Sequence, residues 1–295
     1  MLKSARYMAK LREAHKQFVD HLKERKRSSA TILAYGKDIE QLVSFLEDLK
    51  KTEAHEVGKE DLEAFMATLA KKGYTPKSIS RKTNSTKTFF RFLKVNEYVT
   101  DDPATLLAHP KFETPPPRIL SKLEYRALRD AARSDTRIST IIEVLLQPGI
   151  RIGELANIHL DDLHLEGAEP TLRVRANEGH PERTIPLNRP AAEAIKRYLE
   201  IRPKTDQDIL FITKTGRPLL IRNIRTAIDR YFRLAGIKDA KVNDLRHTFV
   251  AHHLMAGTSL VVVSKLAGHK RLATTEKYLD FIKGHAEKGV KLGEL

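Results

Sequence analysis

Four segments in the second half of this 295-residue chain carry arginine, histidine and tyrosine side chains that packing does not obviously require. They are PGIRIGEL with Arg151, NDLRHTF with Arg246, LAGHK with His269, and the later Tyr278. A phosphodiester under attack by an oxygen nucleophile gains negative charge on its non-bridging oxygens, which the planar fork of arginine can pair. Histidine can donate to those oxygens or move a proton near neutral pH. A tyrosine hydroxyl, with a pKa of about 10, needs such surroundings before it attacks.

His269 and Tyr278 stand nine residues apart, so their convergence depends on the local fold. On one continuous helix nine residues rotate by roughly 900°, which leaves the two side chains on opposite faces. The chain must therefore turn between them. Gly268 and the segment HKRLATT supply the break, and Thr274 or Thr275 can cap a new helix. The sequence permits the convergence without demanding it.

The first third of the chain has helical periodicity throughout. In 28–49, for example, the apolar positions are three and four residues apart, while 58–73 begins with acidic residues and ends Lys-Lys-Gly, as the helix dipole and a C-cap prefer. With an opening helix near 4–23 and another over 75–96, the pattern predicts a four-helix unit.

The segment HPKFETPPPRILS, residues 109–121, contains four prolines and cannot continue a helix. It predicts a stiff linker between two domains. Beyond it, helices near 121–133, 136–147 and 151–158 give way to two short β-rich runs within 171–187, and more helices follow. We therefore expect a mainly α fold with a small β-sheet, divided into a helical domain (1–108), a linker (109–119), a second domain (120–283) and a tail (284–295).

The formal charge of +15 predicts a polyanionic partner. Charge is concentrated between residues 71 and 94, where eight basic residues and no acidic residue occur. A solvated helix face is the ordinary explanation for a charge run, but such faces normally mix signs, and this one interleaves Ser and Thr, which bind phosphates. It therefore predicts a DNA-backbone surface formed by Lys77, Arg81, Lys82, Lys87 and Arg91.

Several other classes of protein fit the sequence poorly. No apolar run is long enough to span a bilayer, and the N-terminus lacks the apolar core of a signal peptide. The chain has no cysteine, which excludes disulfides and thiolate chemistry and fits a cytoplasmic location. His247, His252 and His253 are close in sequence, but no acidic residue lies among them and their spacing suits no common ligand face, so we expect no metal site.

At this point the sequence resembles the tyrosine recombinase (phage integrase) family, in its short two-domain, Xer-like form. SSATILAYGKDIEQLVSFL resembles the start of the family's helical, SAM-like core-binding domain, with Thr31, Tyr35 and Asp38 at the family's spacing. PGIRIGEL resembles the first-arginine box, NDLRHTF the His-x-x-Arg box and LAGH the Gly-His box, and Tyr278 falls at the nucleophile's distance. The resemblance therefore implies a mixed α/β catalytic domain after the linker.

The resemblance also implies roles for these residues. Arg151 and Arg246 would bind the phosphate, His269 would assist them, and Tyr278 would form a 3′-phosphotyrosyl link that releases a 5′-hydroxyl. Because that link keeps the phosphodiester energy, neither a cofactor nor a catalytic metal is implied. The expected partner is double-stranded DNA bound by a homotetramer, with a second recombinase or an accessory protein as a further partner and the nucleoid as the location.

Two positions depart from the family pattern. The family has a catalytic lysine in the β-hairpin, where this chain has Glu178, and no lysine occurs between Lys122 and Lys196. Arg175 or His180 could substitute for it, although arginine is a poor proton donor. Asn243 replaces the first histidine of the His-x-x-Arg box, and it can donate a hydrogen bond without carrying charge.

These departures leave alternatives open. The chain could be a weakened or silent DNA-binding relative that acts as an accessory or regulatory factor, or an enzyme resembling type IB topoisomerases. The persistence of both arginines, His269 and Tyr278 favours an active strand-exchange enzyme, and the short chain with its small basic helical domain favours recombination over topoisomerase activity.

Overall fold

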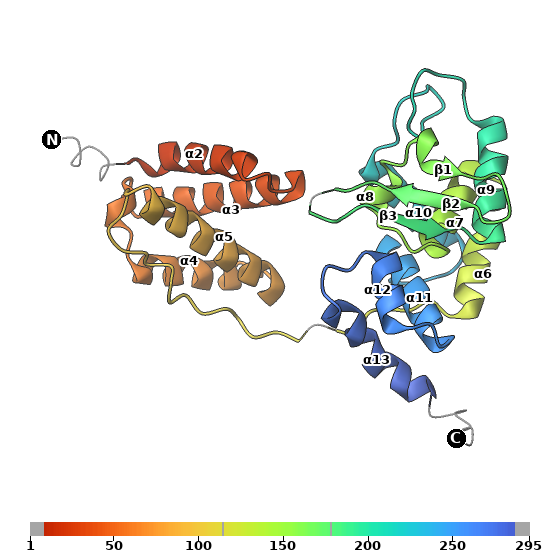
Figure 1. The fold of residues 1–295 in the computed structure, drawn as a ribbon. Helices are drawn as coiled ribbons and strands as arrows, with labels where there is room; N and C mark the ends of the chain where they lie inside the picture. The colour runs from red at the N-terminus through yellow and green to blue at the C-terminus, as the bar shows by residue number, and fades with distance from the viewer. Residues whose placement is uncertain (1–8, 114, 178, 287–295) are drawn as a thin grey trace. The chain divides into compact units, whose positions relative to one another are not determined.

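The computed structural model describes residues 9–113, 115–177 and 179–286, and the chain divides into two compact units (Figure 1). Unit 1 spans Met1–Thr114 and unit 2 spans Pro115–Leu295, so the division falls within the proline-rich segment. Glu178 and residues 287–295, most of the expected tail, lie outside the described residues.

Unit 1 contains the helices expected from the periodicity, although the opening helix, expected near 4–23, begins at Leu11. Its described helices are α2 (Leu11–Glu24), α3 (Ser29–Asp48), the 3₁₀ turn η1 (Ala54–Glu56), α4 (Lys59–Lys71) and α5 (Pro76–Val95). Two of the starts are capped by side chains, because Ser28 accepts from the backbone of Thr31 and Thr75 from that of Ser78. Phe18, Phe89 and Phe90 pack in the core at the centre of this unit.

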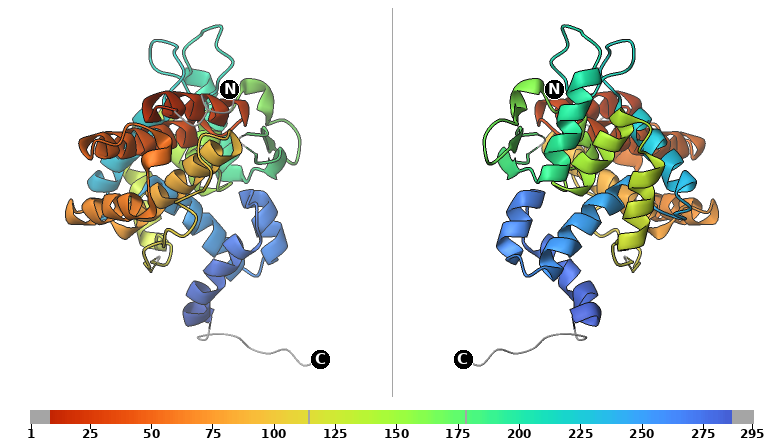
Figure 2. Two further views of the ribbon diagram at one scale, coloured as in Figure 1. Left: turned by 90° about the vertical axis from the view of Figure 1, so that its left-hand side faces the viewer. Right: turned by 90° about the vertical axis from the view of Figure 1, so that its right-hand side faces the viewer.

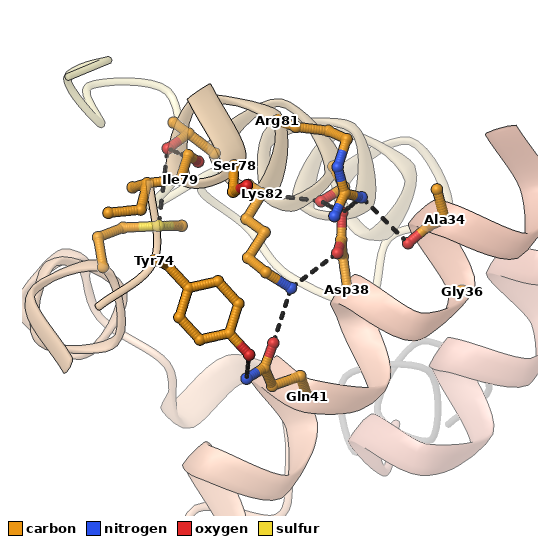
Figure 3. Close-up of polar contacts among 12 residues, drawn as sticks. Ala34, Gly36, Asp38, Gln41, Tyr74, Ser78, Ile79, Arg81 and Lys82 are labelled. Atoms are coloured by element: carbon orange, nitrogen blue, oxygen red, sulfur yellow. Dashed lines mark hydrogen bonds and ion pairs between the residues drawn. The ribbon is translucent and has the colours of Figure 1, made fainter. Parts of the chain in front are cut away.

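A buried carboxylate ties α3 to α5 in unit 1 (Figure 3). Asp38 is 2% exposed, and its Oδ1 lies 2.8 Å from the ammonium of Lys82, which also donates to Gln41 at 2.7 Å. Its Oδ2 accepts from Ser85 at 3.1 Å and pairs with Arg81. Lys82 is itself only 6% exposed, so the expectation that it contacts DNA is wrong: its charge neutralises Asp38 inside the unit.

Unit 2 consists of helices packed with a small β-sheet. Its elements in chain order are α6 (Lys122–Ala131), α7 (Thr136–Leu146), α8 (Ile152–Leu155), η2 (Leu160–Asp162), β1 (Leu163–His164), β2 (Thr171–Val174), β3 (Arg183–Pro186), α9 (Arg189–Ile201), α10 (Ile221–Leu234), α11 (Val242–Met255), α12 (Leu260–Ala267) and α13 (Ala273–Ala286). The sheet is antiparallel in the order β1-β2-β3, with Leu172 opposite Ile185. The predicted class, mainly α with a small sheet, is confirmed.

Two helices of unit 2 differ in length from the expectation. The helix expected over 151–158 is reduced to α8, Ile152–Leu155, and its end turns into a loop where the side chain of Asn157 bonds the carbonyl of Gly153. At the other end, α13 runs to Ala286, past the expected start of the tail at residue 284. No helix among the described residues has the length and apolar character needed to cross a membrane.

The last three helices have a core of their own. Phe249 and Val250 of α11, Val263 of α12, and Tyr278 and Ile282 of α13 form a buried cluster. These helices group together in Figure 1 and in both views of Figure 2. Gly149 lies against this cluster with a φ of 63°, and a Cβ there would be 2.1 Å from the ring of Phe249. The turn before α8 therefore needs glycine both for its backbone and for its contact.

The Asp38 pair predicts a large effect in unit 1. Asp38→Asn should destabilise the unit by about 3 kcal/mol, because it leaves the buried ammonium of Lys82 without its counter-charge. Hydrogen exchange of the slowest amides in α3 and α5 measures this loss in the full chain. Asp48→Asn, at the exposed end of α3, is the matched control and should change exchange little. Equal protection in the two variants would contradict a structural role for the pair.

Candidate active site

The four segments predicted from the sequence meet at the C-terminal end of α12. Gly268 ends this helix in the left-handed conformation, with a φ of 64°. Arg151 precedes α8 as its N-cap residue, and Arg246 lies within α11. His269 follows Gly268 directly, and Tyr278 is in the second turn of α13. α12 ends at Gly268 and α13 begins at Ala273, so the chain turns between His269 and Tyr278, as the spacing required. Thr274 and Thr275, expected as caps, lie inside the new helix instead.

Both predicted phosphate-binding arginines are held by this helix end. Arg246 donates from Nη1 to the carbonyl of Gly149 at 2.7 Å and from Nη2 to that of Ala267 at 2.5 Å. Arg151 donates from Nη2 to the carbonyl of Gly268 at 2.6 Å. Burial and the nearby charge of Arg151 lower the pKa of Arg246 to about 10, so it remains charged at neutral pH. Each guanidinium has five N–H donors, so donors remain for an anion.

A third arginine, Arg183 of β3, completes the cluster. It donates from Nε to the carbonyl of Leu266 at 2.8 Å and makes a two-pronged pair with Glu154 at 3.0 and 2.8 Å. Glu154 also accepts from Arg151 at 2.8 Å. Burial by itself raises the pKa of Glu154, but the hydrogen bonds from Arg183 and the backbone of Arg151, with their charges, hold it at about 2. Glu154 is therefore ionised and forms ion pairs with both arginines, Arg151 and Arg183.

Tyr278 is almost buried, with 5% of its surface exposed, and its hydroxyl contacts α11. Its Oη lies 2.5 Å from Nδ1 of His247, whose Nε2 is 2.8 Å from the side-chain amide of Asn243. Burial raises the pKa of Tyr278 and the charge of Arg246 opposes that shift. Asn243 thus reaches the phenol through a histidine rather than directly.

His269 lies on the ring of Tyr278. The two rings are 6.5 Å apart between centroids and inclined by 17°, and Nδ1 of His269 lies 2.7 Å from the hydroxyl of Thr275. Burial and the charges of Arg246 and Arg151 lower the pKa of His269 to about 4. It is therefore neutral at neutral pH.

The hairpin between β2 and β3 carries the three expected substitutes for a lysine. Glu178 lies outside the described residues. Arg175 is engaged by Asp162 at 2.8 Å and Asp161 at 2.5 Å, so the expectation that it leans into the site is not met. His180 lies in the site: burial, then the charges of Arg151 and Lys270, lower its pKa.

A lysine does reach the hairpin, from another segment. A Cβ built on Gly179 would lie 3.1 Å from Nζ of Lys270, the residue after His269. The sequence of the hairpin gives no sign of it, because Lys270 lies some ninety residues further along the chain. Its ammonium group thus lies at Gly179, and its charge, like that of Arg151, lowers the pKa of His180 after burial.

Comparisons with known proteins agree with this arrangement. Residues 118–285 match the model of the phage integrase family, and residues 15–97 match the phage integrase N-terminal SAM-like domain. The chain belongs to the phage integrase family. It is 31% identical to the tyrosine recombinase XerC of Thermodesulfovibrio yellowstonii, over 88% of this chain and 89% of that one, and 34% identical to XerC of Staphylococcus carnosus, over 86% and 88%.

Solved structures of the family share its fold. A lambda integrase dimer bound to a COC′ core site superposes with a TM-score of 0.75 at 16% identity, covering 99% of this chain and 81% of that one. XerA recombinase is 27% identical, with a TM-score of 0.52, over 93% of this chain and 98% of that one. The expected SAM-like domain and recombinase catalytic domain are confirmed, and this family member is a tyrosine recombinase, an enzyme that breaks and rejoins DNA.

The basic surface expected on α5 of this integrase-family chain is partly present. Lys77, Arg81 and Arg91 are exposed and Lys87 is half-buried, whereas Lys82 is buried. Arg81 keeps 44% of its side chain exposed while it pairs with Asp38. The described residues contain no group of histidine and acidic side chains that could hold a metal ion.

Glu154 predicts a pH-dependent contribution to stability. Its pKa falls from an ordinary 4.5 to about 2 on folding, a difference that corresponds to about 3 kcal/mol. Because the folded pKa is depressed, this stability is present above pH 4.5 and is lost as pH falls towards 2. Glu154→Gln should therefore lower the unfolding free energy of unit 2 by about 3 kcal/mol at pH 7 and by much less at pH 3.

Urea unfolding followed by circular dichroism at both pH values measures this difference. Glu166→Gln, at a side chain that is 97% exposed, is the matched control and should behave as the wild type. A deficit of equal size at both pH values would show that the ionised carboxylate is not what stabilises the arginine cluster.

Proposed function

We propose that this chain recombines DNA at specific sites with Tyr278 as its nucleophile, Arg151 and Arg246 as its phosphate-binding groups, and His269 as their assistant. The observation that carries the proposal is the position of the Tyr278 hydroxyl. This phenol is held beside a cluster of three arginines with one carboxylate, an excess of positive charge that a phosphodiester would balance.

In the first step, N–H groups of the site bind the scissile phosphate. Arg151 and Arg246 hold the non-bridging oxygens of the scissile phosphate with the N–H groups that the helix carbonyls leave unused. With the hydroxyl of Thr275 donating to Nδ1, the Nε2–H of neutral His269 donates to the same phosphate. These hydrogen bonds strengthen as charge develops on the phosphate oxygens, which lowers the barrier.

In strand cleavage, one bond to phosphorus forms and another breaks. The Oη of Tyr278 forms a bond to phosphorus, and the bond from phosphorus to the 5′ oxygen breaks, leaving a 3′-phosphotyrosyl link and a 5′-hydroxyl. The 5′-hydroxyl of a second strand then attacks this link and releases Tyr278. Since one phosphodiester replaces another, the cycle needs no nucleotide hydrolysis.

Lys270 supplies the proton for the leaving 5′ oxygen in this proposal. A lysine ammonium can give up a proton to a developing alkoxide, which an arginine does poorly. Lys270 lies at the hairpin beside Gly179 and His180. It therefore replaces the lysine missing from the hairpin, and the alternative of a silent relative loses its main support.

The wider assembly follows from the same substrate. We propose that Lys77, Arg81, Lys87 and Arg91 of α5 bind the DNA backbone in unit 1, and that four copies act together on two paired duplexes. The comparison with a lambda integrase dimer on a core site supports assembly on DNA. A DNA substrate of this kind places the protein in the cytoplasm with the nucleoid, where a second recombinase or an accessory protein can join it.

The nucleophile is tested with a nicked duplex that traps the cleaved state. Tyr278→Phe should abolish the covalent protein–DNA band and leave DNA affinity almost unchanged, because only the attacking oxygen is lost. Tyr231→Phe, at a tyrosine of α10 with the same 5% exposure, is the matched control and should form the band. A covalent band that survives in the Tyr278→Phe variant would overturn the assignment.

The role of Lys270 is tested by changing the leaving group. Lys270→Ala should slow cleavage of an ordinary duplex on the order of 10²-fold or more, as expected for loss of a general acid. A duplex with sulfur in place of the bridging 5′ oxygen releases a thiolate that needs no proton, so it should restore the rate. Lys265→Ala, at an exposed lysine of α12, controls for lost charge. An equal deficit on both substrates would assign Lys270 to DNA binding alone.

A further inference from the structure

His247 contacts the hydroxyl of the proposed nucleophile, and it is not one of the groups proposed to bind the phosphate. Its Nδ1 lies 2.5 Å from the Oη of Tyr278, with the two rings 5.8 Å apart and inclined by 47°. It follows Arg246 on α11, so the same helix holds a phosphate-binding arginine and a nitrogen base at the phenol. A base within hydrogen-bond reach of the proton that must leave satisfies the first requirement for general-base catalysis.

We propose that His247 accepts the proton of the Tyr278 hydroxyl during strand cleavage and that Asn243 sets the tautomer that allows this. The inference rests on the proposed role of Tyr278 as nucleophile. It makes His247 a catalytic residue, since it touches the reacting oxygen, and Asn243 a positioning residue, since it acts through the imidazole.

Asn243 is placed to control the imidazole because it stands one helical turn before His247. Its amide lies 2.8 Å from Nε2, on the far side of the ring from Tyr278. The oxygen and the nitrogen of an amide have nearly the same shape, and the side chain of Asn243 is exposed, so either atom can face the ring. With the oxygen towards Nε2, that nitrogen keeps its hydrogen and Nδ1 presents its lone pair to the phenol.

The same orientation suits the imidazolium that forms. After transfer, Nε2–H still donates to the amide oxygen and Nδ1–H donates to the phenolate oxygen, so no group has to turn during the reaction. The arrangement has the logic of a base oriented by a third group. Asn243 therefore serves the reaction without taking up charge itself.

The surroundings keep His247 unprotonated before the reaction. Burial is the largest effect that lowers the pKa of His247. The charge of Arg246 lowers this pKa further, whereas the carboxylate of Asp244 raises it. Asn243 and Tyr278, its hydrogen-bond neighbours, are uncharged at neutral pH. A neutral imidazole is the form that can accept a proton.

His269 is less suited to this task, although it also lies at Tyr278. It stacks on the phenol ring, inclined by 17°, and the hydroxyl of Thr275 occupies its Nδ1. Its contact is therefore with the face of the ring, whereas that of His247 is with the hydroxyl oxygen. The two histidines divide the work, with His269 at the phosphate and His247 at the nucleophile.

The step balances in atoms and electrons. The proton moves from Oη to Nδ1 of His247 while a lone pair of Oη forms the bond to phosphorus. The electron pair of the broken bond stays on the 5′ oxygen, which takes a proton from Lys270. In rejoining, the attacking 5′-hydroxyl gives its proton to the neutral amine of Lys270, and His247 returns its proton to Tyr278 as the bond from phosphorus to Oη breaks.

The test separates proton transfer from Tyr278 from protonation of the leaving group. Single-turnover cleavage is measured against pH on the duplex with a bridging 5′ sulfur, where the leaving group needs no acid. The wild type should show a rate that falls at low pH as His247 becomes protonated. In His247→Gln the side chain can still hydrogen-bond the phenol but cannot hold its proton, so the rate at pH 7 should fall on the order of 10²-fold or more. Its rate should then keep rising with pH until Tyr278 ionises.

A second variant keeps His247 in place. Asn243→Asp should raise the pKa of His247, since a carboxylate favours the imidazolium, so the fall in rate should move to higher pH than in the wild type. A purely structural role for either residue would not move the pH profile in this way. His252→Gln, at an exposed histidine of the same helix, is the matched control and should retain the wild-type rate and profile.

The outcomes separate the two proposals. A covalent band that persists in Tyr278→Phe overturns the nucleophile and this inference with it. If that band is lost but His247→Gln cleaves at a near wild-type rate with an unchanged profile, only the role of His247 is overturned. Salt-dependent DNA binding and melting of His247→Gln show whether it is folded. If it is not, an unshifted profile in Asn243→Asp overturns the inference by itself.

Discussion

Three consecutive carbonyls at the end of α12 organise the site, because each accepts a hydrogen bond from an arginine of a different segment. Leu266 accepts from Arg183 of β3, Ala267 from Arg246 of α11, and Gly268 from Arg151 before α8. A helix C-terminus carries partial negative charge and unsatisfied carbonyls, which suit it to bind cations. The helix end thus binds arginines that lie up to 117 residues away in the chain and compensates part of their mutual repulsion.

The compensation is incomplete, because three arginines share one carboxylate and positive charge remains in excess. Glu154, ionised down to a pH of about 2, supplies the one full negative charge that two of the three arginines share. Burial lowers the pKa of Arg246, and the nearby charges of Arg151 and Arg183 lower it further, as expected where three arginines share one carboxylate. A phosphodiester would relieve that excess, and its transition state, with more negative charge, would relieve it further. Gly268 permits the close packing, since a Cβ there would lie 2.7 Å from Nη1 of Arg183.

Much of this could be predicted from the sequence because it is local. The helices of unit 1 follow from apolar spacing and Ser or Thr caps, and the break at Gly268 follows from glycine chemistry. The predictions that failed concern residues whose positions depend on contacts between distant segments. Lys82 looks like its basic neighbours on α5, and only its packing against Asp38, 44 residues earlier, shows that it is internal. Arg175 is likewise diverted by Asp162, whereas Arg183, which does enter the site, has no local feature that singles it out.

The lysine that the hairpin lacks is a second example of a feature that depends on contacts between distant segments. A role in a site is defined by where an atom lies, so a side chain from another segment can fill it. Gly268 binds Arg151, His269 stacks on Tyr278, and Lys270 reaches the hairpin at Gly179. Three adjacent residues therefore contact Arg151, Tyr278 and the hairpin at Gly179. Any shift of this short segment would disturb all three contacts at once. The segment is held by Gly268 in its left-handed turn and by the hydrogen bond between His269 and Thr275.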